Sequence, residues 1–444
     1  MKRVRRVYHG LVADWLIENS GERKGEHIGL IAEHLELAGR HELASDYFFQ
    51  AGEQAASKYA NTESADYLNR AIALVEENDL ETQYKITAIL EHVNDLLGNR
   101  EAQAANLAEM ERLAKTLNDP EKQAETAVRS ATYANTISNY PAAIKAAKQA
   151  IQLAETARNK EIEAEGYLAW SMALWNQADY VSSQERTEFA LNIADTFELK
   201  HLISKIYRHF GAIHQYQENY PEALRFYEKA LTIARDVGDR RGEGMILNNL
   251  GIVAYYQGNV MKARDYFERT LVIFREIGDR LSEGHMVNNL GVFAHNLGDY
   301  PRSQELLKQA LVIHREVNNR WGEGNALKNL ASLSETQGNY SQARIFIEQA
   351  LDILKQIGDH WVEGLAQFNL GDTLTGLGNF EQASEAYYQS INLFEKIGSQ
   401  QFAIAETIPD EETRRSFLGN IPWHREIVTL YNELGYEVFP ITES

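Results

Sequence analysis

Apolar residues recur at steps of three and four along most of this chain, as the buried face of an α-helix requires. One such run covers residues 245–256 and a second covers residues 263–274. Gly258 separates the two runs, because glycine enters the left-handed conformation that ends a helix without a Cβ clash. A second break follows at Gly278, and Asp279 after it can cap the next helix. The sequence therefore predicts a unit of helix, turn, helix and turn.

The unit returns every forty residues. Its first helix carries the same tripeptide in four successive copies: Asn249-Leu250-Gly251, Asn289-Leu290-Gly291, Asn329-Leu330-Ala331 and Asn369-Leu370-Gly371. A fixed period of this size indicates an array in which each unit buries its apolar face against its neighbours. We expect an all-α solenoid of about nine helix-turn-helix pairs over residues 41–400, clearest over 201–400. Residues 1–40 and 401–444 leave the period and are predicted to be helical N- and C-terminal caps.

The order of small and large residues resembles the tetratricopeptide repeat. The matching residues are Leu250 and Gly251 in the first helix, then Ala263, Phe267 and Thr270 in the second. The resemblance implies a right-handed superhelix whose first helices line a concave surface. The usual period of this repeat is about 34 residues. The longer form looks like the repeats of kinesin light chains, Pins-type spindle adaptors and bacterial signalling ATPases.

Both ends of the chain carry a second resemblance. Residues 6–23, 32–55 and 414–427 look like parts of the helical tail of large bacterial signal-transduction ATPases, of the STAND or cyclase type, in which a nucleotide-binding domain precedes a repeat array. No G-x-x-x-x-G-K-[ST] motif occurs here, so the sequence gives no sign of a nucleotide-binding loop. The resemblance implies a bacterial sensor or scaffold, with a nucleotide-binding signalling domain supplied by a longer parent chain or by a separate protein.

The charge balance limits the classes of partner that the protein can bind. Lys and Arg number 44 against 64 Asp and Glu, a net charge of −20, which disfavours nucleic acid because phosphates are repelled. There is no cysteine, hence no disulfide framework or thiol nucleophile. There is also no apolar run of about 18 residues that could cross a membrane. We expect a cytoplasmic protein that binds neither nucleic acid nor membrane.

Catalytic and metal-binding patterns are also missing. Neither H-E-x-x-H nor G-x-S-x-G appears, so we expect no enzyme activity, no catalytic residue and no cofactor. His27, His34 and His41 recur seven residues apart. That spacing separates them by two helical turns, about 10 Å, too far to share one ion, so we expect no metal site.

The candidate site is a ladder of asparagines on the predicted first helices. Its members are Asn248, Asn249, Asn288, Asn289, Asn329 and Asn369. An amide offers two donors and an acceptor, so such a ladder can hydrogen-bond the backbone of an extended peptide. Resemblance to kinesin-light-chain-like and chaperone-adaptor arrays implies this role. An alternative stays open, in which the asparagines bond each other or cap a neighbouring helix as structural rungs.

Cations and aromatic residues follow the same face. Lys205, Arg208, His209, His285 and Lys328 form a positive stripe in an otherwise acidic protein. We hypothesise that this stripe attracts a carboxylate or an acidic segment of a partner. Tyr216 and Tyr255 are aromatic residues with a polar tip, which are common anchors in interfaces.

The favoured function is a non-catalytic scaffold that holds an extended segment of a protein partner in its groove. One rival is a sensor for a small ligand, as a resemblance to regulator ATPases of the maltose-activator type allows. That sensor would need a closed pocket near Trp170, Trp175 and Tyr216. The other rival is a solenoid that associates with itself. Concentration-dependent mass would indicate self-association, and an open groove in a monomer would indicate peptide binding.

Overall fold

The computed structural model describes residues 2–19, 24–137, 139–177, 179–357 and 359–405, and these residues form twenty α-helices and no strand. The two N-terminal helices are α1 (Lys2–Asn19) and α2 (Lys24–Ala38). The following helices are α3 (His41–Ser57), α4 (Asn61–Leu74), α5 (Leu80–Leu97), α6 (Arg100–Leu117), α7 (Pro120–Thr136), α8 (Tyr140–Ala157), α9 (Lys160–Asn176), α10 (Tyr180–Thr196), α11 (Lys200–Tyr216) and α12 (Tyr220–Asp236). The last eight are α13 (Arg240–Tyr256), α14 (Val260–Glu276), α15 (Arg280–Asn296), α16 (Tyr300–Glu316), α17 (Arg320–Thr336), α18 (Tyr340–Ile357), α19 (His360–Gly376) and α20 (Phe380–Ala405).

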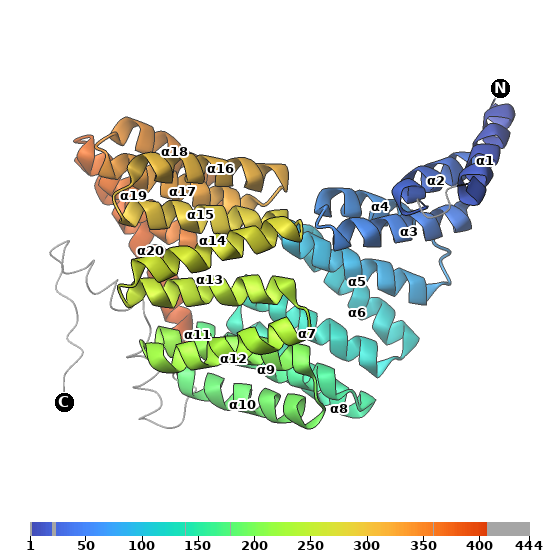
Figure 1. The fold of residues 1–444 in the computed structure, drawn as a ribbon, viewed down its shortest axis with the longest axis horizontal. Coiled ribbons are helices and arrows are strands. Elements are labelled where there is room, and N and C mark those ends of the chain that lie inside the picture. The colour runs from blue at the N-terminus through green and yellow to red at the C-terminus, as the bar shows by residue number, and fades with distance from the viewer. Residues whose placement is uncertain (1, 20–23, 138, 178, 358, 406–444) are drawn as a thin grey trace.

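Consecutive helices pack side by side along the whole array (Figure 1). Within the described ranges, α3 to α20 make nine pairs, and the predicted all-α solenoid of about nine pairs is confirmed. The turns are also as predicted. Gly258 and Gly278 have φ angles of 76° and 72°, and Asp279 caps α15 by accepting a hydrogen bond from the Ser282 amide.

Close approach of the two helices in a pair depends on a glycine in the first helix. A Cβ atom added to Gly251 would lie 2.5 Å from the Phe267 ring, and one added to Gly291 would lie 2.8 Å from Leu307. Real Cβ atoms do not approach other atoms so closely, so the large side chain occupies the space that glycine leaves. In the units that contain Gly251 and Gly291, the glycine of the Leu-Gly dipeptide is therefore a packing requirement, whereas the unit with Ala331 tolerates a methyl group there.

A buried glutamate near the start of the first helix is held by two arginines in three successive units. Glu283 accepts from Arg275 Nε at 2.8 Å and from Arg280 at 2.7 Å. The same arrangement surrounds Glu243 and Glu323. Because one arginine ends the preceding helix and the other begins the glutamate's own helix, the carboxylate fixes the turn between two units.

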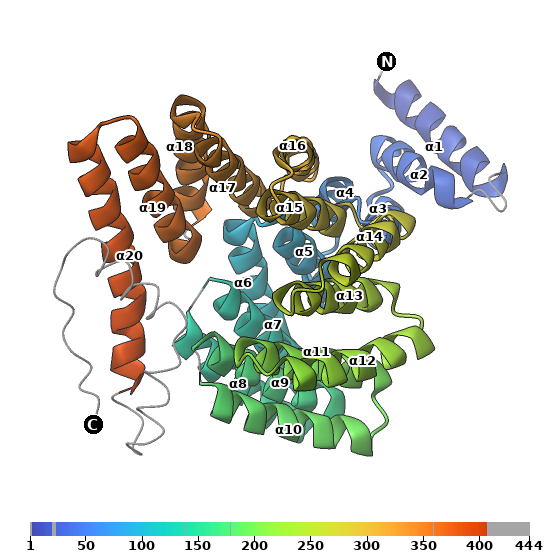
Figure 2. The same cartoon turned by 60° about the vertical axis from the view of Figure 1, so that its left-hand side comes forward.

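The array curves until early units meet late ones. Asn318, in the turn before α17, donates to Thr62 Oγ1 in α4 at 3.3 Å. Figures 1 and 2 both show the α4 and α5 region beside α14 and α15. A cavity of about 370 Å³ lies at this junction, with Arg100 and Ile137 from the early units and Trp321 and Asp359 from the late ones.

The predicted domain boundaries stay a prediction. Helices α1 and α2 cover most of residues 1–40, and α20 continues past position 400 to Ala405. The rest of the predicted C-terminal cap lies outside the described residues. In the part of the chain that the structure describes, none of the helices has the length and apolarity needed to span a membrane.

Candidate functional site

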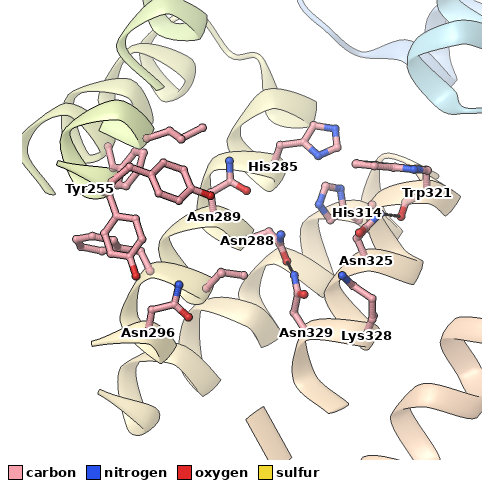
Figure 3. Close-up of a pocket in the computed structure, with 16 residues that line it drawn as sticks. Tyr255, His285, Asn288, Asn289, Asn296, His314, Trp321, Asn325, Lys328 and Asn329 are labelled. Atoms are coloured by element: carbon pink, nitrogen blue, oxygen red, sulfur yellow. Dashed lines mark hydrogen bonds between the residues drawn. The ribbon is translucent and has the colours of Figure 1, made fainter. Parts of the chain in front are cut away.

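A cavity of about 680 Å³ opens on the face formed by the first helices α13, α15 and α17 (Figure 3). Tyr255 lies at one end of it, and Trp321 and Lys328 lie at the other. Asn288 and Asn289 of α15 occupy the middle of its wall. The first helices therefore line the hollow, as the position of the asparagine ladder in the sequence predicts.

The asparagines hydrogen-bond one another across adjacent units. Asn289 donates through Nδ2 to Asn248 Oδ1 at 3.3 Å, and Asn329 donates to Asn288 Oδ1 at 3.1 Å. Within α13, Asn248 donates to Asn249 Oδ1 at 3.4 Å. These contacts form the structural rungs that the sequence leaves as an alternative. Each donating amide keeps a second N–H, so the rungs do not exhaust its hydrogen-bonding capacity.

The remaining ladder members lie outside the lining of this cavity. Asn249 lines a smaller cavity of about 240 Å³, together with Asn248. Asn369 holds the same register in α19, is half-buried and is not part of the lining of the larger cavity.

The residues of the predicted positive stripe differ in how deeply they are buried. Lys205 is exposed, whereas Arg208 is half-buried and lines the smaller cavity beside Asn248. Burial lowers the pKa of Arg208 and that of Lys328. His209 is not available to the groove: it is buried, lies 2.9 Å from Ser171 Oγ, and burial lowers its pKa to about 3. Its imidazole is thus neutral and adds no charge to the stripe.

The two predicted aromatic anchors also differ in their position relative to the large cavity. Tyr255 lines the large cavity and packs edge-on against Phe293 at 5.7 Å between ring centroids. Tyr216 lies outside that lining and contacts Trp175 edge-on at 4.8 Å. Trp170, which the small-ligand alternative needs in a pocket, has its ring within 4.5 Å of both the Lys148 ammonium and the Arg186 guanidinium. The Trp170 ring therefore makes its cation–π contacts with side chains of the protein itself.

Comparison with known proteins identifies the repeat. The tetratricopeptide repeat model matches residues 202–276, 282–356 and 337–396. The matched units are tetratricopeptide repeats. Among curated proteins, none matches the sequence.

Several solved structures have a similar fold. A Rap protein complexed with Competence and Sporulation Factor aligns with a TM-score of 0.55 and 15% identity, over 80% of this chain and 99% of that one. Aspartyl phosphate phosphatase F from Bacillus subtilis aligns with a TM-score of 0.50 and 14% identity, over 79% and 93%. At these identities the likeness is one of fold. A STAND protein with a tetratricopeptide repeat sensor from Pyrococcus horikoshii aligns with a TM-score of 0.47 and 16% identity, over 78% of this chain and 55% of that one. We draw no conclusion from a TM-score below 0.5.

The tetratricopeptide unit at 281–320 contributes two histidines to the wall of the large cavity. The rings of His285 and His314 lie 4.9 Å apart between centroids, and Asn319 Nδ2 lies 3.3 Å from a nitrogen of each. Burial lowers the pKa of His285 to about 4. Burial and the neighbouring His285 lower the pKa of His314 to about 3. Both rings are therefore neutral near pH 7.

His314, Trp321 and Asn325 are polar or aromatic residues of the cavity lining that the sequence did not lead us to expect, and Asn319 contacts His314 from outside that lining. His314 lies on a second helix, where the buried face is apolar except for Ser303, and a histidine at that spacing was the available signal. Among the described residues, no group of three or more His, Asp or Glu side chains is arranged to hold a metal ion.

Proposed function

We propose that this array binds an extended segment of a partner protein along the concave face of α13, α15 and α17. The observation that carries the proposal is the 680 Å³ cavity whose wall contains Asn289, the rung between Asn288 and Asn329 and, at its ends, Tyr255 and Trp321. A cavity of that volume is in the range of ligand sites. Its open face along the first helices of three successive units suits an elongated ligand.

The rungs suit backbone recognition. Asn289 and Asn329 each use one N–H to bond the preceding unit, which holds the amide plane in one orientation. The second N–H of each is then fixed in direction and can donate to a peptide carbonyl. Fixing these side chains in advance reduces the entropy that binding must offset. In this proposal the structural and ligand-binding roles of the asparagines belong together.

The likeness of fold to a Rap protein complexed with Competence and Sporulation Factor supports a binding role for this architecture. We infer that the chain is the regulatory or sensing part of a bacterial signalling system. A nucleotide-binding signalling domain would come from a longer parent chain or from a separate protein.

A photo-crosslinking residue at Asn296 tests the proposal. Asn296 is exposed and lines the cavity, so replacing it disturbs no packing. Benzoylphenylalanine at 296 should crosslink a partner from lysate, and mass spectrometry should map the crosslink to one short segment. The control places the same residue at Asn192, exposed on α10. Equal capture from both positions, or from neither, would contradict a groove that holds a segment.

Self-association is the second candidate, because α1 exposes an apolar face. Six large apolar side chains of this helix are more than a third exposed: Val4, Val7, Tyr8, Leu11, Val12 and Trp15. An exposed patch of this kind is a common mark of an interface. Sedimentation over a range of concentrations tests whether the protein self-associates. A mass that rises with concentration in the parent and not in a Leu11→Ser/Trp15→Ser variant would support self-association.

A further inference from the structure

The outward face of α1 carries four large apolar side chains in one line, which we call the α1 stripe. Val4, Tyr8, Leu11 and Trp15 follow one another at steps of four, three and four residues, and each is more than half exposed. At 3.6 residues per turn, these positions span about 60° of the helix surface. A narrow apolar seam of this kind is what one helix presents to a single partner helix.

The opposite face of α1 is already packed. Ala13 and Leu16 are buried and belong to a core that α1 shares with α2 and α3. On the same side, His9 Nδ1 lies 2.8 Å from His34 Nδ1 of α2. Figures 1 and 2 show α1 at one end of the array, and among the described helices α2 is the one that packs along it. The α1 stripe is therefore a second apolar face, in addition to the one that holds α1 to the array.

The order of small and large side chains in the α1 stripe suits a copy of itself that runs in the opposite direction. In an antiparallel pair of α1 helices, Val4 of one copy lies opposite Trp15 of the other, and Tyr8 lies opposite Leu11. The spacing of four, three and four is symmetric, so both copies form the same layers. Each layer joins an aromatic ring with a smaller side chain, as even packing between two helices requires. A parallel pair would instead set ring against ring and valine against valine.

Charge also favours the antiparallel direction. Arg5 and Arg6 are exposed near the start of α1, and Glu18 is exposed near its end. A parallel pair would bring the arginines of both copies together, where like charges repel. In the antiparallel register Arg5 lies opposite position 14, nine positions from the second Arg5. That is about 13 Å along the axis, more than the screening length of about 8 Å.

The acidic end of α1 then lies beside the basic end of the second copy. Asp14 bonds Arg40 of its own chain at 2.5 Å. Glu18 therefore supplies the negative charge that complements the arginines. The size of the side chains and the position of the charges thus point to the same register.

We propose that two copies of this chain associate through an antiparallel pair of α1 helices, in which each α1 stripe covers the other. This inference rests on self-association, the second candidate function, and adds its surface, direction and register. One helix from each copy makes an interface at the small end of the range for specific complexes, so we expect a dissociation constant in the micromolar range. The cavity lined by α13, α15 and α17 is not part of this interface, so the dimer presents two such cavities.

A membrane surface is the other occupant that a helix with arginines and a tryptophan suggests. The net charge of −20 opposes it, because the anionic surface of a membrane repels an acidic protein. Insertion into lipid also requires no matching of large with small side chains, which the α1 stripe shows. The observations therefore favour a second copy.

Sedimentation velocity at roughly 1 to 100 μM tests the surface, since this range brackets a micromolar dissociation constant. We expect the parent to change from monomer to dimer. Leu11→Ser/Trp15→Ser should weaken the dimer about 30-fold or more, the usual effect of truncating a central aromatic anchor. The matched control is Met261→Ser on α14, where the side chain is 74% exposed and the dissociation constant should not change. Equal weakening by both changes would overturn the assignment to α1.

Cysteines introduced singly test the direction, because the chain has none of its own. A disulfide forms only when the two Cα atoms lie within about 7 Å. In the antiparallel pair, Val4→Cys faces Trp15→Cys of the second copy, whereas two copies of one variant hold their thiols eleven positions, about 16 Å, apart along the axis. Oxidation should therefore give a covalent dimer when the two variants are mixed and not when either is alone. A covalent dimer from each variant alone would establish a parallel pair and overturn the proposal.

The remaining outcomes separate this inference from the functions on which it rests. A parent that dimerises without any disulfide in the mixture would keep self-association and overturn the α1 pair. A parent that stays monomeric at every concentration would overturn both. If that monomer also co-sediments with phosphatidylglycerol vesicles and the Leu11→Ser/Trp15→Ser variant does not, a membrane surface replaces the second copy. The crosslink at position 296 is read independently, so none of these results decides whether the cavity binds a segment.

Discussion

Asn318 donates to Thr62 Oγ1 at 3.3 Å and so joins two turns that are 256 residues apart. Asn318 has a φ of 53°, a left-handed conformation that the corresponding residues Gly238 and Gly278 adopt as glycines. Asparagine tolerates this conformation less well than glycine. Its presence here accompanies the contact between early and late units, which no glycine side chain could make.

Asn318→Gly is expected to loosen that contact without unfolding the array. Glycine suits the backbone angle, so local stability should be kept, while the hydrogen bond to Thr62 is lost. The chain has no cysteine, so spin labels can be attached uniquely at Glu63→Cys and Lys355→Cys, both exposed. The distance distribution between the labels should be narrow in the parent and broader in the variant. An unchanged width would mean that the hydrogen bond does not hold the units together.

The helices and turns of this array follow from local rules, which is why the sequence predicts them. Gly278 and Asp279 specify a turn through backbone freedom and capping, and Gly251 specifies close packing through its missing Cβ. The contact between Asn318 and Thr62 depends instead on small angles between units that add up over the array. No short segment of the sequence specifies the total curvature that these angles produce.

The candidate site, too, could be predicted only in part from the sequence. The helical register placed Asn288 and Asn289 on the concave face, where the cavity lies. Register alone could not decide whether they bond each other or a ligand, because that depends on the spacing between adjacent first helices. His209 was misjudged because its register matches Asn249, but it is buried against Ser171. His314 was missed because its helix lies on the outer layer.

Asn289→Ala is expected to lower the free energy of unfolding by about 1 kcal/mol, the usual net value of a half-buried hydrogen bond. The variant leaves Asn248 Oδ1 without its donor from the next unit. Chemical denaturation followed by circular dichroism measures the loss. The matched control is Asn296→Ala, on the same helix and exposed, where we expect almost no change. Equal stabilities of the two variants would show that the rung is not a structural element.

Glu283→Gln is expected to destabilise the array by about 1–3 kcal/mol, because hydrogen bonds to a charged group are stronger than neutral ones. The carboxylate is buried and bonded to Arg275 and Arg280, which together keep its pKa lowered against the opposing effect of burial. A lowered pKa means that this stabilisation is present above the ordinary pKa of 4.5 and is lost as the pH falls below it.

The control for this change is Glu305→Gln on α16. Glu305 pairs with Arg302 at 2.6 Å, but both side chains are more than half exposed. Exposed pairs of this kind contribute at most about 1 kcal/mol. A thermal denaturation series should therefore rank Glu283→Gln well below Glu305→Gln in stability. The reverse order would show that burial of the carboxylate does not strengthen the pair.

The free energy of unfolding should fall as the pH is lowered from about 7.5 to about 5.5. His209, His285 and His314 have pKa values lowered by burial to about 3, 4 and 3. Once unfolded, each regains an ordinary pKa near 6.5, so over this interval the unfolded chain binds more protons than the folded one. Each such histidine should then cost about 1.4 kcal/mol across the interval.

His314→Phe isolates one of these contributions. The variant places the side chain of Phe274 and Phe394 at the corresponding position, so the core should still pack. Its dependence on pH should be shallower than that of the parent by about 1.4 kcal/mol over the same interval. Asn296→Ala, at an exposed position without a titrating group, serves as the control and should leave the slope unchanged. A parent and a His314→Phe variant with parallel pH profiles would mean that His314 is already charged in the folded protein, because only a histidine that is neutral when folded and protonated when unfolded contributes to the slope.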